Sequence, residues 1–358
     1  MDIKISKYQI SVLIIGFILG NYSIFNSIKN LGQDFWIVFV LGWLLSFLLA
    51  FIYVKIIVNN SKTNFVNIII DSFGSTIGRI IILLYILYFL YQSSINLRMV
   101  SEYYVTVNYL ETPIISILIL IGFLIFYSLS KGIDTIARTA EILTPIGLIL
   151  VSFTFFFVSS NFDFKYLKPI FQISNITIIR YSFIVLSNTF GGLFVFILIS
   201  NFVPNKSGIY KTIFISIAIS GTFILVLLFR DLLILGPDML ERNVFPPNRT
   251  SNFVSNILLE PILSFDILLG GSLKVMLYTY GLLALLSQLC NIKNYKPFIL
   301  VVISLLISFS NWIIDDITQL TDIVEKSHIY LTLPFQIIIP ILILILQKIK
   351  RKRINSLS

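Results

Sequence analysis

The sequence predicts an all-α polytopic membrane protein, and three observations support this fold class. Of its 358 residues, 57% are hydrophobic and only 12% are charged, whereas a soluble domain of this length needs a far more charged surface. The apolar residues form long continuous runs, as transmembrane helices require. The basic residues gather in alternate connections between these runs, as the positive-inside rule expects of a multi-pass protein.

Ten apolar runs are long enough to cross a bilayer, which takes about 20 residues per helix. We expect the whole chain, 1–358, to form a single integral membrane domain. The spans are predicted at about 9–28, 35–57, 78–106, 113–130, 140–159, 176–203, 209–234, 267–289, 297–314 and 329–347. Because ten is an even number, both termini should lie on the same side of the membrane.

The basic residues predict that both termini are cytoplasmic. Most Lys and Arg fall in the connections on that side and in the tail 348–353, while the other side takes most of the acids. The net charge of +9 is therefore explained by topology and by contact with anionic membrane lipid. Nucleic acid is not expected as a partner.

The sixth span is interrupted in its middle by residues that disfavour an α-helix. Ser187, Asn188 and Thr189 compete with the helical hydrogen bonds, and each glycine of the pair Gly191 and Gly192 costs about 1 kcal/mol. Irregular backbone at membrane depth is tolerated only where protein or a watery cavity satisfies it. We therefore predict a discontinuous helix whose backbone binds a ligand. Close packing of small residues against another helix is the alternative.

The first span has interruptions of its own. Gly16 and Gly20 lie four residues apart, which would also suit a tight helix contact, and a polar run follows from Asn21 to Asn26. Spans one and six are five apart in a set of ten, which is the pattern of a LeuT-like 5+5 inverted repeat with its site at the broken helices. The repeats would cover about 9–159 and 176–314, with 329–347 counted in the second half.

Polar side chains within two other spans are candidates for gate or ligand contacts. Arg98 and Glu102 lie four apart on one face of the third span, where neutralising each other is the alternative role. Lys274 lies early in the eighth span, where pairing with Asp266 or Glu102 competes with contact to a ligand carboxylate. Tyr91 lies in the third span with Arg98 and Glu102 and is a further candidate for a gate or ligand contact.

Catalytic and metal chemistry are not expected. With one cysteine, Cys290, and one histidine, His328, the chain lacks the ligands of most zinc, iron–sulfur and disulfide sites. We expect Cys290 to be a packing residue and His328 to lie solvated in the polar connection before the tenth span. No phosphate-binding glycine loop or Ser–His–Asp set is visible, so we predict no enzyme and no cofactor.

The inner connection between the fourth and fifth spans carries an ordered set of polar residues, and Gly132 within it offers a backbone position with positive φ. This elbow and features elsewhere resemble the B subunits of spore germinant receptors, a branch of the amino acid–polyamine–organocation transporter superfamily. The residues that carry the resemblance are Gln9, Thr112-Pro113, Gly132, Ala137, Arg138, Glu141, Lys168-Pro169, Glu260 and Phe265-Asp266. The chain departs from the family pattern at 269–271, Leu-Gly-Gly, in a segment where a Trp is expected.

The resemblance implies a multi-pass subunit in the spore inner membrane, a bacterial cell membrane, that binds a small germinant resembling an amino acid. It also implies that the response passes to companion A and C subunits and triggers germination. Half-helix N-termini carry free N–H groups and partial positive charge, which suit a carboxylate. The residues expected to bind the germinant are Gly16, Phe17, Gly20, Asn21, Asn188, Thr189, Phe190, Gly191 and Gly192.

Two other functions fit the predicted fold. An ion-coupled secondary transporter of amino acids would use the same architecture, although few membrane carboxylates are available for a proton relay. A ligand-gated ion channel subunit is the third hypothesis.

Overall fold

The computed structural model describes residues 4–20, 31–60, 63–204, 206–253 and 259–355. Within these ranges the chain is helical and has no strand. The first half contains α1 (Lys7–Leu19), α2 (Phe35–Asn59), α3 (Phe65–Phe73), α4 (Ser75–Tyr103), α5 (Ile114–Lys131) and α6 (Ile133–Val158). The second half contains α7 (Asn175–Val185), α8 (Val195–Ile199), α9 (Ile209–Arg242), α10 (Pro246–Ser251), α11 (Glu260–Leu289), α12 (Ile299–Ile313), α13 (Ile317–Asp322), α14 (His328–Leu333) and α15 (Ile339–Asn355).

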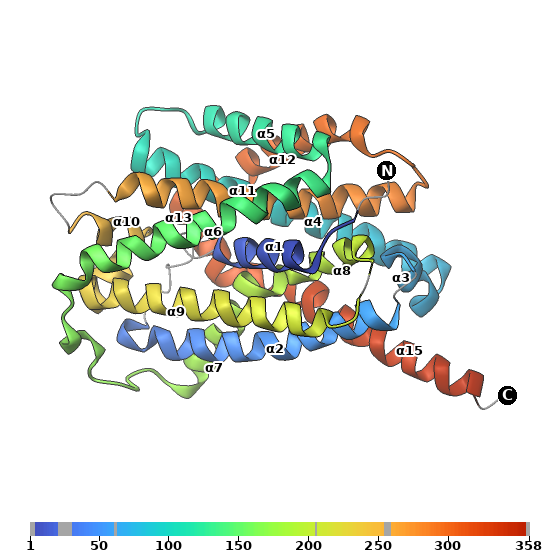
Figure 1. Ribbon diagram of the computed structural model, residues 1–358, viewed down its shortest axis with the longest axis horizontal. Coiled ribbons are helices and arrows are strands. Elements are labelled where there is room, and N and C mark those ends of the chain that lie inside the picture. Colours follow the sequence, from blue (N-terminus) through green and yellow to red (C-terminus); the bar gives the residue numbers. More distant parts are fainter. Residues whose placement is uncertain (1–3, 21–30, 61–62, 205, 254–258, 356–358) are drawn as a thin grey trace.

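The predicted all-α membrane fold is confirmed. Nine helical segments of the described chain are long and apolar enough to cross a membrane, and they correspond in order to the second to tenth predicted spans. The shorter apolar helix α1 lies at the place of the first. Figure 1 shows the N and C labels at the same end of the bundle, as an even number of spans requires, with α10 at the opposite end.

Several predicted boundaries differ from the structure. The fifth span begins at Ile133 instead of about 140, the seventh ends at Arg242 instead of about 234, and the eighth begins at Glu260 instead of about 267.

The α1 helix ends at Leu19 with Gly20 as its C-cap, and the predicted residues from Asn21 onward lie outside the described residues. The tenth span begins at Ile317 instead of about 329, because α13, α14 and α15 follow one another through two π turns into one long crossing. His328 consequently lies inside the membrane span, and its expected solvent exposure is wrong.

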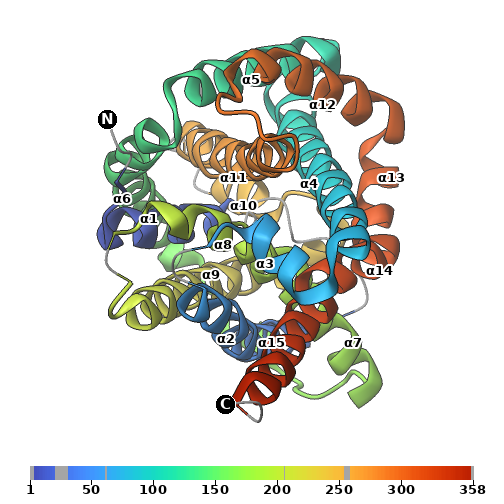
Figure 2. The same ribbon diagram turned by 90° about the vertical axis from the view of Figure 1, so that its right-hand side faces the viewer.

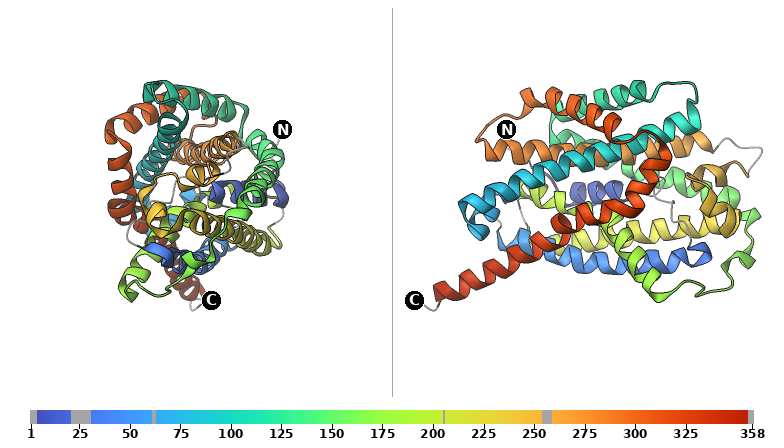
Figure 3. Two further views of the ribbon diagram at one scale, coloured as in Figure 1. Left: turned by 90° about the vertical axis from the view of Figure 1, so that its left-hand side faces the viewer. Right: turned by 180° about the vertical axis from the view of Figure 1, so that it is seen from behind.

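The sixth and eighth spans form the centre of the bundle. Figure 2 shows α8 and α11 in the middle with α1 beside them, surrounded by α2, α4, α5, α9, α12 and α15. Figure 3 shows the same arrangement from the other end, and its view from behind shows α15 running diagonally across the outside. Most residues of the sixth and eighth spans are buried, whereas only a minority of those of the fifth and tenth spans are. A helix that is apolar all round and surrounded by others is typical of such a core.

The start of α1 contacts the connection between the fourth and fifth predicted spans, which contains Gly132 and Glu141. Ser6 and Gln9 form a capping box, and the Gln9 amide also donates to Glu141 of α6 at 3.0 Å. Gly132 of this elbow has φ +107°, as predicted for a position that favours glycine. Two residues of the resemblance, Gln9 and Glu141, therefore join the first span to the fifth.

Glycine brings α1 and α11 into backbone contact. A Cβ added at Gly270 would lie 2.7 Å from the Cα of Gly20, and one added at Gly20 would meet the Gly270 carbonyl group. Small residues at membrane helix contacts allow this approach because they leave no side chain between the backbones. The pair Gly16 and Gly20 of α1 therefore allows the tight helix contact that the sequence analysis considered for them.

Two buried arginines pair with carboxylates within the bundle. Arg98 and Glu102 form an ion pair at 2.8 Å, and Arg98 also donates to the carbonyl oxygens of Ser310 and Asp315. Arg230 and Asp231 form a second buried pair at 2.7 Å inside α9. A charge in a low-dielectric interior is tolerated when it is paired and hydrogen-bonded.

The contact between α1 and α11 leads to a test of packing. Gly270→Ala should lower the melting temperature of the purified protein, because its Cβ would press on Gly20 backbone, and overpacking typically costs about 1–3 kcal/mol. Gly281→Ala on the same helix is the control, since its Cβ would meet only side-chain atoms of Phe89 and Val195 at 3.2 Å. Equal melting temperatures for the two variants would contradict the proposed constraint.

Candidate functional site

The regular α-helix of the sixth span stops where the sequence predicted. After α7 the chain forms a π turn over Leu186–Phe190 and a 3-10 turn over Gly191–Phe194 before α8 begins. Phe190 (φ −112°, ψ −24°) and Gly191 (φ −62°, ψ −30°) stay in the right-handed helical region. The predicted discontinuity is confirmed and is a change of winding, not an extended gap. It shifts the hydrogen-bond partners of the backbone because π and 3-10 turns use different spacings.

Gly191 and Gly192 lie against other spans at this change of winding. A Cβ at Gly191 would collide with the side-chain amide of Gln336, and one at Gly192 with the hydroxyl of Tyr278 and the ring of Phe17. Glycine is therefore required here for close approach, because any side chain would occupy the space of its neighbour. The backbone of the sixth span meets α1, α11 and the tenth span at these two residues.

Phe17 and Gly16 face different neighbours although they are adjacent in α1. The Phe17 ring contacts Tyr278 and Phe196 edge-on, with centroids 5.2 and 5.8 Å apart. Gly16 instead faces α6 and α11, where an added Cβ would lie 2.9 Å from Thr144 Oγ1. Of the candidate residues of α1, Phe17 joins the change of winding in α7–α8, whereas Gly16 and Gly20 line contacts with other helices.

Lys274 is the charged group at the change of winding. Its side chain is 2% exposed, and Nζ donates to the carbonyl oxygen of Asn188 at 3.3 Å. The ammonium also lies 5.2 Å from the Phe17 ring centre and 5.8 Å from that of Tyr278, within cation–π range. Lys274 thus brings together candidate residues from spans one, six and eight.

Neither alternative partner considered for Lys274 forms an ion pair with it in the described structure. Glu102 pairs with Arg98, and the carboxylate of Asp266 faces Gly147 of α6, where an added Cβ would lie 3.0 Å from Oδ1. The remaining candidates Thr189 and Phe190 are buried, and Phe190 packs against Phe39 of α2 with centroids 6.2 Å apart.

A buried polar network ties the sixth span to the tenth. Gln336 is fully buried, and its amide donates to the hydroxyl of Tyr88 and the carbonyl oxygen of Ser187, both at 3.1 Å. Ser187 Oγ donates to Gln336 Oε1 at 2.8 Å and lies 2.5 Å from Thr332 Oγ1. Tyr53 donates to the carbonyl oxygens of Gly191 and Gln336. Buried polar groups are tolerated in lipid when they satisfy one another in this way.

His328 and Tyr91 extend this polar region along the tenth span. His328 is 5% exposed and lies 3.1 Å from the Tyr91 hydroxyl and 3.4 Å from the Gln92 amide. Tyr91 is therefore a contact of His328. Arg98 and Glu102, further along α4, have their described contacts with each other and with the region of Ser310 and Asp315.

The sequence analysis missed the contribution of the tenth span. His328, Thr332 and Gln336 are spaced four residues apart, which places them on one helical face. This spacing in an apolar segment indicates a polar face on the tenth span. It was not recognised because the predicted span began at 329 and left His328 in the preceding connection.

The described residues contain no group of three or more His, Cys, Asp or Glu side chains that could hold a metal ion. The polar groups of the region are the Lys274 ammonium, side-chain amides, hydroxyl groups and backbone carbonyls.

Comparisons with known proteins agree with the fold and with the resemblance. A family described as "Spore germination protein" matches residues 4–320. Spore germination protein KB of Bacillus subtilis (strain 168) is 28% identical over 375 residues, covering 98% of this chain and 96% of that protein. Spore germination protein YndE of the same organism is 28% identical over 172 residues, covering 47% of each chain.

A solved structure of a Na⁺-coupled sialic acid symporter, in a substrate-bound outward-open state, superposes with a TM-score of 0.62. It is 11% identical in sequence, and the match covers 92% of this chain and 85% of that one. The symporter has the LeuT fold, so the predicted LeuT-like architecture is confirmed.

The contact between Gly191 and Gln336 leads to a double-mutant test. Gly191→Ala should destabilise the protein because its Cβ would collide with the Gln336 amide, and Gln336→Ala should remove that collision. Residues in direct contact typically couple by about 0.5–3 kcal/mol, so the double variant should melt higher than the sum of the single effects predicts. Additive shifts of the melting temperature would show that the two residues are not in contact.

Proposed function

The chain belongs to the spore germination protein family, and on that premise we propose that it is the germinant-sensing membrane subunit of a spore germination receptor. Its ligand is a small molecule resembling an amino acid, bound near the midplane between α1 and the change of winding in α7–α8. The response passes to companion A and C subunits in the spore inner membrane.

The environment of Lys274 supports a ligand with a carboxylate group. The Lys274 ammonium is buried at the change of winding, between the rings of Phe17 and Tyr278 and beside the Asn188 carbonyl. An ammonium in a low-dielectric site binds a carboxylate strongly, through a charge-assisted hydrogen bond. The Asn188 carbonyl and the hydroxyl of Tyr278 offer acceptors to the amino group of the same ligand.

Ligand entry must change the packing of this region. The space beside Gly191 and Gly192 is filled by Gln336, Tyr278 and Phe17, so a ligand there displaces side chains that join the first, eighth and tenth spans. A ligand shifts a conformational equilibrium by its difference in affinity for the two arrangements. A sensor needs one arrangement without ligand and another with ligand, and in this proposal the two differ in the positions of the displaced side chains.

Binding is tested with the full chain in lipid nanodiscs and a panel of labelled amino acids. Lys274→Gln should weaken binding by about 10- to 100-fold, because a hydrogen bond to a charged group contributes about 1.5–3 kcal/mol. Lys326→Gln is the control, since it removes an equal charge whose side chain is 63% exposed and pairs with Asp322. Unchanged affinity in a folded Lys274→Gln protein would contradict the proposed site.

Transport is distinguished from sensing by turnover. Proteoliposomes of the isolated chain should bind labelled amino acid without accumulating it. Uptake driven by a sodium or proton gradient would instead indicate a secondary transporter, and unitary currents from the purified complex would indicate a channel subunit.

The proposed orientation, with both termini cytoplasmic, is tested with the single cysteine. Cys290 is exposed and follows the last residue of α11, at the end of the eighth span that this orientation places inside. A membrane-impermeant maleimide should label it in permeabilised cells that produce the chain and not in intact ones. Labelling of intact cells would reverse the orientation.

A further inference from the structure

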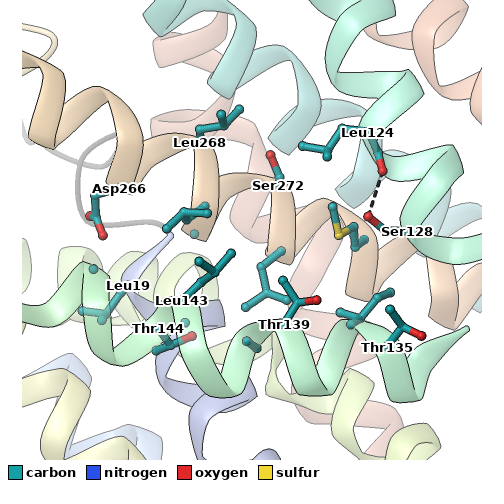
Figure 4. Close-up of a pocket in the computed structure, with 18 of the residues that line it drawn as sticks. Leu19, Leu124, Ser128, Thr135, Thr139, Leu143, Thr144, Asp266, Leu268 and Ser272 are labelled. Atoms are coloured by element: carbon teal, nitrogen blue, oxygen red, sulfur yellow. Dashed lines mark hydrogen bonds between the residues drawn. The ribbon is translucent and has the colours of Figure 1, made fainter. Parts of the chain in front are cut away.

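A cavity lies outside the region of Lys274, between α1, α5, α6 and α11. Its volume is about 360 Å³, within the range of small-molecule sites. Most of its lining is apolar, with leucines from all four helices, including Leu19, Leu124, Leu143 and Leu273. Figure 4 shows the cavity as an elongated space with Asp266 at one end and Thr135 at the other.

Two polar groups of α11 line this cavity without a protein hydrogen bond among the described contacts. Ser272 is 2% exposed, and its hydroxyl has no hydrogen bond, which indicates a missing partner because buried polar groups are normally satisfied. Asp266 is half-buried, and its carboxylate faces Gly147 of α6 and the cavity with no hydrogen bond or ion pair among the described contacts. A carboxylate in an apolar cavity is stable in its charged form when a cation accompanies it.

The spacing of these two groups indicates the size of the partner. Asp266 and Ser272 are six residues apart on one helix, which separates them by about 9 Å along its axis. A single metal ion holds oxygen ligands at about 2–2.6 Å, so one ion cannot satisfy both groups. An elongated organic cation can satisfy both and bury an apolar middle against the leucines.

The cavity has an opening on the membrane side. Leu124 and Tyr127 of α5 line it and are 38% and 56% exposed, and residues exposed on a spanning helix face lipid. A ligand with an apolar body can therefore enter from the bilayer.

We propose that this cavity is a binding site for an elongated primary ammonium compound, with its ammonium group on Asp266, its apolar chain along α6 and α11, and a polar group on Ser272. The site is separate from that of the proposed germinant, because α1 lies between them. Gly16 lines the cavity, whereas the next residue, Phe17, contacts Tyr278 and Lys274.

The probe is labelled 6-amino-1-hexanol, and the protein is the full chain in nanodiscs of zwitterionic lipid, which does not attract cations. Binding should saturate at one molecule per chain. The neutral analogue 1,6-hexanediol should compete at least about tenfold more weakly, because it lacks the charge that pairs with Asp266. Equal competition by the diol would overturn the proposal.

Asp266→Asn should weaken binding about tenfold and abolish the preference over the diol. Glu260→Gln, which removes a carboxylate from the same helix outside the cavity, should bind as the unmodified chain does. Unchanged affinity in Asp266→Asn would overturn the proposal.

Thr139→Trp provides a test that leaves the carboxylate in place. Thr139 lines the cavity from α6 and is exposed, so its replacement fills the space with little effect on the packed interior. Binding should be lost, and a folded Thr139→Trp chain that still binds the probe would overturn the proposal. Lys274→Gln should leave probe binding unchanged, which keeps this test independent of the proposed germinant site.

Discussion

The structure depends on close packing at the centre of the bundle, where the first, sixth and eighth spans meet. At the contact points these spans carry glycines, because a side chain there would collide with the neighbouring span. Gly20 and Gly270 bring α1 onto α11, and Gly191 and Gly192 bring the sixth span onto Gln336 and Tyr278. The change of winding at Leu186–Phe194 follows from the same crowding, since π and 3-10 turns redirect backbone groups that a regular helix would keep internal. Without these glycines the first, sixth and eighth spans could not share one core.

The polar network around Gln336 joins the sixth span to the third and tenth spans at this packed centre. Ser187 and Tyr88 satisfy the Gln336 amide, Thr332 hydrogen-bonds to Ser187, and Lys274 is held by a carbonyl and two aromatic rings. A ligand that displaces Gln336 or Tyr278 has to replace these contacts with its own.

The helix α1 divides the interior into two polar regions. Phe17 faces the region of Lys274, and Gly16 faces the cavity that contains Asp266 and Ser272. The two regions therefore share one short helix, which separates them.

The sequence by itself determined the membrane class, the order of the spans and the interruption of the sixth span, because apolar length and the cost of Ser, Asn and Gly in a helix are local properties. It also predicted the positive φ of Gly132 and singled out Lys274 as a charged residue within a span. The tertiary structure alone decided which face of α1 meets Lys274, that Gln336 fills the space beside Gly191, and that Asp266 points into a cavity instead of pairing with Lys274. His328 shows the reason. Its local sequence is polar, yet it is buried because Tyr91 and Gln92, more than two hundred residues earlier, lie beside it, and no local pattern encodes such a contact.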